Sequence, residues 1–140
     1  MQLSIDTNVR SIDIVRNGEN VGKVSFSLSD PALLSRLRTV SKKADDIQAS
    51  SKLSELEDID AQLDEATRID KEMRKLLDWA FGSPVSDIVF GDSFCFSTAN
   101  GVTAMEQFLS GVTPFIEEAF KAELSAAKER QDKYLSKYRK

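Results

Sequence analysis

Few side chains in this sequence could carry out catalysis. The chain contains no histidine, and histidine is the commonest general base and metal ligand in proteins. A Ser-His-Asp triad, a Cys-His pair and the usual zinc sites, which need histidine or several cysteines, therefore cannot form. Glycine-rich phosphate loops of the GxGxxG or GxxxxGK[ST] type are also absent from the sequence. We predict that the protein is not an enzyme and that it holds no cofactor or metal ion.

The single cysteine, Cys95, lies between Phe94 and Phe96 and has no lysine or arginine within six positions on either side. A reactive thiolate needs a nearby positive charge or a helix N-terminus. We therefore predict that Cys95 is a small, buried, apolar residue. One cysteine cannot form an internal disulfide, which fits a reducing compartment.

Carboxylates cluster at Asp58, Asp60, Asp64 and Glu65. In a helix, Asp60 and Asp64 lie one turn apart on the same face, where a hard cation could bind. No calcium-binding loop surrounds them, so we interpret the cluster as the solvated face of a helix.

Aromatic side chains are concentrated in the second half of the chain. Five lie within eighteen residues and three more follow: Trp79, Phe81, Phe90, Phe94, Phe96, Phe108, Phe115 and Phe120. We expect most of them to form the core and a minority to line an exposed groove, because aromatic residues are frequent anchors of protein interfaces. The predicted partner-binding residues are Trp79, Phe81, Phe115, Phe120 and Leu124.

Nucleic acid is not an expected partner. Aromatic residues that stack on RNA bases are accompanied by basic residues, whereas residues 79–110 contain no lysine or arginine. The net charge of the chain is −4, so no overall positive field would attract a phosphate backbone.

The elements that would position these side chains follow from the hydrophobic pattern. Within residues 1–29, apolar and polar residues alternate in two runs, which predicts an antiparallel β-hairpin. Asn17-Gly18 between the runs favours a type I′ turn. Gly22 suggests a bulge, which would lengthen the loop, and Leu3 with Ile5 could supply a short third strand.

Residues 30–81 are expected to be helical. Asp30-Pro31 predicts the start, because aspartate caps free N–H groups and proline is tolerated at the first helical position. Apolar residues then recur every three or four positions from Leu33 to Ile47 and, with a shifted phase, from Leu56 to Ala80.

The sequence leaves open whether this region is one helix or two. No glycine or proline lies between Ala32 and Phe81, so one helix with a stutter is possible, and we favour it. The alternative is a pair of helices that break near Ser50-Ser51. A single helix of that length cannot be buried along its whole length in a small monomer, so part of it is expected to face a partner or the C-terminal helix.

Residues 82–140 are expected to form short helices and a C-terminal helix. Gly82 suits the left-handed position after a helix, and Pro84 cannot continue that helix. The expected order is a short helix over residues 85–90, a loop over residues 94–101, a helix over residues 102–110 and a C-terminal helix from Thr113-Pro114.

The expected fold class is α+β and mostly α, with a small N-terminal β-hairpin, a long helix and a C-terminal helical region. A length of 140 residues fits a single domain, residues 1–140. The sequence shows neither a signal peptide nor an apolar run near the roughly 20 residues that span a bilayer. We therefore expect a cytoplasmic protein with no membrane partner.

Charge is distributed unevenly. Residues 45–78 contain eleven acidic and five basic side chains, a net charge of −6, whereas residues 121–140 contain seven basic and three acidic ones, a net charge of +4. Two solvated helix faces would explain this, with a basic C-terminus that suits the helix dipole. Alternatively, the opposite charges would steer head-to-tail or antiparallel pairing between copies.

The C-terminal half contains a set of short motifs. They are LLDWAFG at residues 76–82, VFGD at residues 89–92, QFL at residues 107–109 and PFIEEAF at residues 114–120, before a tail rich in lysine, arginine and tyrosine. This set resembles the tail assembly chaperones of long-tailed bacteriophages and prophages of Gram-positive hosts. The N-terminal hairpin followed by a long charged helix is similar to the same small phage proteins.

The resemblance implies a function without catalytic residues. Such proteins bind the long, hydrophobic, helical tape-measure protein during tail assembly, keep it soluble in the cytoplasm of the bacterial host, and are displaced by tail tube subunits. The implied partners are the tape-measure protein, further copies in a homo-oligomer, and the tail tube protein. The alternatives are a structural tail-completion or head–tail adaptor protein and, in a different class, a hydrolase that uses carboxylates and a bound cation.

Overall fold

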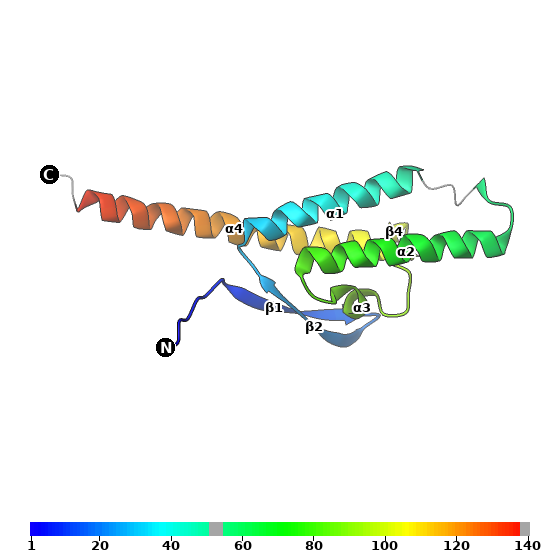
Figure 1. Cartoon of the computed structure of the whole chain (residues 1–140), viewed down its shortest axis with the longest axis horizontal. Coiled ribbons are helices and arrows are strands. Elements are labelled where there is room, and N and C mark those ends of the chain that lie inside the picture. Colours follow the sequence, from blue (N-terminus) through cyan, green and yellow to red (C-terminus); the bar gives the residue numbers. More distant parts are fainter. Residues whose placement is uncertain (51–54, 138–140) are drawn as a thin grey trace.

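The computed structural model describes residues 1–50 and 55–137. The elements are β1 (Val9–Arg16), β2 (Glu19–Ser27), α1 (Pro31–Ser50), α2 (Ile59–Phe81), α3 (Val85–Phe90), β3 (Thr98–Ala99), β4 (Val102–Thr103) and α4 (Ala104–Ser136). The three long helices α1, α2 and α4 run along the length of the molecule, while the β1–β2 hairpin and α3 lie on one side of them (Figure 1). This arrangement confirms the predicted α+β class with an N-terminal hairpin.

The hairpin turns at Asn17-Gly18. Both residues have positive φ, 53° and 82°, as a type I′ turn requires, so this prediction is confirmed. The pairing shifts between Ile14 and Val15, which confirms a bulge beside Gly22 while the loop keeps two residues.

The third strand expected from Leu3 and Ile5 does not form. Both side chains are exposed, and residues 1–8 contain no strand. Asn8 has a φ of 59°, which interrupts the extended backbone directly before β1.

Residues 30–81 form two helices, so the preference for one long helix was wrong. The start is as predicted: Asp30 Oδ1 accepts a hydrogen bond of 2.9 Å from the backbone N–H of Ala32. The chain then reverses, and α1 and α2 pack side by side (Figure 1). Pairing the helices buries both apolar faces at once, including Leu37 on α1 and Leu77 on α2, whereas a single straight helix could not bring these two faces together.

Specific residues mark both ends of α2. Asp58 caps α2, because its side chain accepts a hydrogen bond of 3.2 Å from the backbone N–H of Asp60. At the other end of α2, Gly82 adopts the predicted left-handed conformation, with a φ of 69°. The predicted break near Ser50-Ser51 lies at the edge of the described residues, because Ser51 is outside them.

The helices of the C-terminal region differ from the prediction, because the two helices expected over residues 102–110 and from Thr113-Pro114 are one helix, α4. Thr113-Pro114 does not begin a helix, because α4 begins after Thr103, whose Oγ1 accepts a hydrogen bond of 3.1 Å from the N–H of Glu106. The helix continues through Pro114. Proline deprives one carbonyl of its helical donor but keeps a helical φ, and the buried residues Val112 and Ile116 hold the helix on the body on both sides of it.

Residues 94–101, expected to form a loop, include the strand β3, which pairs with β4. Asn100 and Gly101, with φ of 55° and 80°, turn this small hairpin. The expected short helix over residues 85–90 is α3.

The molecule is elongated. Met1 and the C-terminal end of α4 lie at one end of it, and the start of α2 lies at the other end (Figure 1). α4 continues beyond the other helices as a projecting segment, in which residues 121–137 are all exposed.

Candidate functional site

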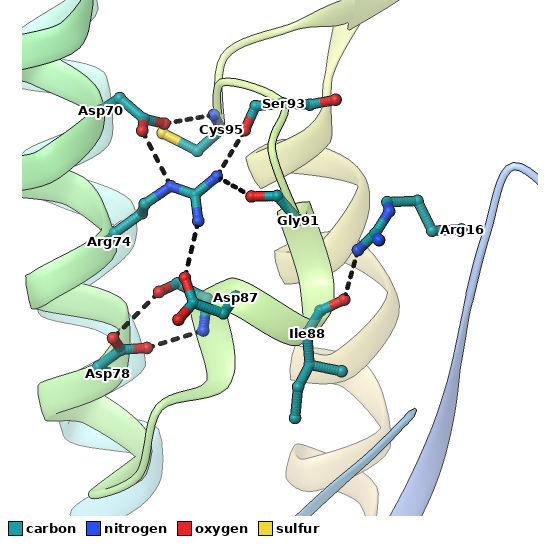
Figure 2. A network of polar contacts seen from close by, with 10 residues as sticks. Arg16, Asp70, Arg74, Asp78, Asp87, Ile88, Gly91, Ser93 and Cys95 are labelled. Carbon is teal, nitrogen blue, oxygen red and sulfur yellow. Dashed lines mark hydrogen bonds and ion pairs between the residues drawn. The ribbon is translucent and has the colours of Figure 1, made fainter. Parts of the chain in front are cut away.

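A polar network centres on Arg74 of α2 (Figure 2). Its Nε donates to Asp70 Oδ2 at 2.9 Å, and Nη1 donates to Asp87 Oδ1 at 3.2 Å. Nη2 donates to the carbonyls of Gly91 and Ser93, at 2.7 and 2.6 Å. The guanidinium also lies 5.6 Å from the centre of the Phe90 ring.

This network fastens α3 and the following loop to α2. Asp70 uses its second oxygen, Oδ1, to accept the N–H of Cys95 at 2.7 Å. Asp78 accepts both the N–H and the hydroxyl of Ser86, at 2.7 and 3.0 Å. Within the described residues, every buried side-chain polar atom has a partner. The geometry is that of a structural clamp, in which the donors and acceptors are already occupied.

Cys95 lies inside this clamp, and its predicted burial is confirmed. Burial raises the pKa of its thiol to about 12, and the negative charge of Asp70 adds to the increase. Arg74 comes close enough to oppose the shift, but the other two effects are larger. The thiol is therefore protonated at neutral pH, and a protonated thiol is a poor nucleophile.

The carboxylates at the start of α2 differ in their interactions. Asp58 is the helix cap, and Glu65 pairs with Arg68 at 2.6 Å. This hydrogen bond lowers the pKa of Glu65 and raises that of Arg68. Asp60 and Asp64 are exposed. In the part of the chain that the structure describes, no group of three or more acidic, histidine or cysteine side chains could hold a metal ion.

The five predicted partner-binding residues do not form one surface. Phe81 is half-buried, and its ring centre lies 5.5 Å from that of Phe26 and 5.7 Å from that of Phe108. This packing places Phe81 in the core. Trp79, Phe115 and Leu124 are exposed by 51%, 46% and 55%, and Phe120 is half-buried.

Trp79 lies in an open groove between α1 and α2. The apolar part of this Trp79 groove is formed by Ile47 of α1 and by Met73, Leu76 and Trp79 of α2, and its volume is about 500 Å³. The charged residues that complete its lining are Lys43, Arg68, Lys71, Glu72 and Lys75.

The groove has a positively charged rim. Arg68 is neutralised by Glu65 and Glu72. Lys43, Lys71 and Lys75 have no ion pair with any residue that the structure describes. These lysines were not among the predicted binding residues, although Lys71, Lys75 and Trp79 follow one another at the four-residue spacing of a helix face.

The second surface belongs to the projecting segment of α4. We call residues 121–136 the arm. Phe120, Leu124, Ala127, Gln131 and Tyr134 recur at spacings of four, three, four and three, which places them on one helix face. That face is the continuation of the one that buries Ile116 in the body.

The third surface lies at the opposite end. Ile59 and Leu63, in the first turns of α2, are exposed by 68% and 53%. Next to them is a depression of about 360 Å³. It is lined by Ile47, Gln48, Ala66, Ile69, Phe94, Phe96, Ser97 and Thr103. We call Ile59, Leu63 and this depression the acceptor end.

These three surfaces are chemically suited to binding apolar faces of helices. Within residues 1–50 and 55–137, no helix is long and apolar enough to cross a membrane. No protein-family model, curated protein or solved structure matches the chain.

Proposed function

We propose that this protein is a bacteriophage tail assembly chaperone, which binds helical segments of the tape-measure protein in the cytoplasm of the bacterial host and keeps them soluble. The observation that carries the proposal is the Trp79 groove, an open surface between α1 and α2 that has an apolar floor, an exposed tryptophan and a charged rim. The resemblance of the sequence supports it further, because Leu76 and Trp79 of the groove belong to the LLDWAFG motif.

A groove between two packed helices fits a third helix. The side-chain rows of a helix pack into the grooves between those of its neighbours, and amphipathic helices are often recognised in this way. Trp79 would supply the anchor, because a tryptophan buries a large area on binding and its indole N–H can also find an acceptor. Lys43, Lys71 and Lys75 would pair with acidic residues beside the apolar stripe of the incoming helix.

The proposed binding is reversible. The groove is open to solvent and holds one large anchor, so the affinity of a single copy is expected to be moderate. Many copies along one tape-measure chain would cover its exposed apolar stripes, which otherwise aggregate. Tail tube subunits could then displace the copies one at a time.

Co-expression with the tape-measure protein tests the proposal. The wild-type chain should keep the tape-measure protein in the soluble fraction. Trp79→Ala should weaken binding about 30-fold, as expected for loss of an anchor worth roughly 2 kcal/mol. The charge reversal Lys71→Glu/Lys75→Glu should also reduce the soluble fraction.

A matched control is Val15→Ala, which removes an exposed apolar side chain from β1, far from the groove in the chain. This variant should keep as much tape-measure protein in the soluble fraction as the wild type does. If the tape-measure protein is equally soluble with and without the wild-type chain, the proposal is wrong. Detection of the chain in purified virions would instead favour a tail-completion or adaptor protein.

A further inference from the structure

We infer that copies of this protein associate head to tail, with the arm of one copy bound to the acceptor end of the next. This inference goes beyond the proposed function, because the arm and the acceptor end share only Ile47 with the Trp79 groove and because the partner is a second copy of the chain.

The arm is a helix face whose side chains are exposed to solvent. Up to Ile116 this face of α4 is buried against the body. From Leu124 to Tyr134 the same face continues into solvent, and the side chains of Ala127, Gln131 and Leu135 help to form a shallow groove along it. A strict alternation of four and three residues is the spacing with which one helix packs along another.

The acceptor end shows the complementary situation on α2. Leu77, Met73 and Ile69 of α2 are buried in the body. Towards the start of the helix the same face continues through Ala66 to the exposed Leu63 and Ile59. The arm of another copy would therefore extend the helix packing that already exists inside each copy.

Charge favours this pairing. On the arm, Lys121 and Lys128 flank the apolar face on one side, and Arg130 and Lys137 flank it on the other, together with one acidic residue, Glu123. At the acceptor end, the exposed carboxylates of Asp60 and Asp64 lie beside Ile59 and Leu63 on α2. Opposite charges on the two faces attract one another and set the register.

The same charges disfavour pairing between two arms. In an antiparallel pair of arms, Lys121 and Lys128 of one copy would face the same residues of the other, and like charges repel. The acidic acceptor end of a second copy is therefore the better occupant of the arm.

The positions of the two surfaces determine the type of assembly. They lie at opposite ends of an elongated molecule (Figure 1), so an arm cannot reach the acceptor end of its own copy. The interface joins two different surfaces, and such an interface produces open chains or rings rather than a closed two-fold dimer.

Sedimentation velocity on the full chain tests this inference. The average mass should rise with protein concentration and pass twice the 15.6 kDa of one copy. Between about 0.05 M and about 0.5 M salt the association constant should fall at least tenfold, because salt screens exposed charges. A wild-type mass that stops at two copies would contradict the head-to-tail arrangement.

Charge reversal identifies the two surfaces. Lys121→Glu/Lys128→Glu on the arm, or Asp60→Lys/Asp64→Lys at the acceptor end, should each make the protein monomeric. An equimolar mixture of these two variants should associate again, because each reversed surface then meets its opposite charge on the other variant. Arg38→Glu/Lys42→Glu, a charge change of equal size on two exposed residues of α1, should associate like the wild type.

Further variants keep the outcome interpretable. Leu124→Ser/Tyr134→Ser changes only exposed side chains and should abolish association while the helical circular dichroism per residue is preserved. Trp79→Ala should leave association unchanged, so the proposed tape-measure binding and the self-association can fail separately. If the mixture of charge variants stays monomeric, the inference is overturned.

Discussion

Arg74 joins α2, α3 and the loop after α3 through its guanidinium, and it does so in a largely buried position. Its side chain is 15% exposed and that of Asp70 is 12% exposed. A charge held in this environment depends on its partner, because an unpaired buried charge is costly. The i,i+4 spacing of Asp70 and Arg74 is visible in the sequence, but the contacts with Gly91 and Ser93 depend on the tertiary fold and could not be predicted.

Replacing Arg74 by methionine should lower the free energy of unfolding by about 3 to 5 kcal/mol, because Asp70 is left buried without its partner. Urea denaturation measures this change. The double variant Asp70→Asn/Arg74→Met should lose less than the sum of the two single losses. As a control, Arg68→Met removes an exposed arginine and should cost no more than about 0.5 kcal/mol. Equal losses for Arg68→Met and Arg74→Met would contradict the clamp.

The burial of Cys95 was correctly predicted from its neighbours in the sequence. The pKa of its thiol also depends on Asp70, which lies far from it in the chain. Burial raises the thiol pKa from an ordinary value of 9.0 to about 12. The folded state therefore binds this proton more tightly than the unfolded state. The resulting stabilisation is complete below pH 9 and is lost as the pH rises towards 12.

A comparison of the wild type with Cys95→Ala isolates this effect. Between about pH 8 and about pH 11, the free energy of unfolding of the wild type should fall relative to that of the variant. The other titrating groups are common to both proteins and cancel in the difference. Parallel profiles over this range would show that the thiol pKa is not raised in the folded state.

At the scale of elements, the sequence predicted the hairpin, the helix ends at Asp30-Pro31 and Gly82, and the short helix α3. It did not predict the reversal between α1 and α2. The repeating apolar pattern shows which face of a helix is buried, but it does not identify the partner of that face. At Pro114 a local rule for helix starts gave the wrong result, because the cap at Thr103 and the packing of Val112 and Ile116 determine where α4 begins.

Pro114 gives a prediction for α4. Pro114→Ala restores an N–H that can donate to the carbonyl of Ser110, and the exposed proline ring makes no core contact that would be lost. The free energy of unfolding should therefore rise by about 1 to 3 kcal/mol, to be measured by thermal denaturation.

The matched control is Pro84→Ala. Pro84 is also exposed but lies outside the helices, so its replacement restores no helical hydrogen bond and should bring no gain in stability. A Pro114→Ala variant no more stable than the wild type would show that the proline costs α4 nothing.

At the scale of the whole molecule, the opposite charges of residues 45–78 and 121–140 were visible in the sequence. Their separation in space was not, because it depends on the reversal of the chain before α2, which carries the start of that helix away from the arm. The Trp79 groove could not be predicted for the same reason. Lys43 and Ile47 meet Trp79 only when α1 and α2 form a pair.

Both Met1 and the end of α4 lie at the arm end of the molecule, opposite the acceptor end (Figure 1). A bulky domain fused after the arm would therefore prevent the arm from binding another copy, while the acceptor end could still bind the arm of a wild-type copy. Such a fusion would terminate growth of the head-to-tail assembly. Added in small proportion, it would bind the free arm at one end of an assembly and lower the average number of copies. Neither terminus lies at the acceptor end, so a variant that terminates growth at the other end of the assembly would have to be made by substitution on α2.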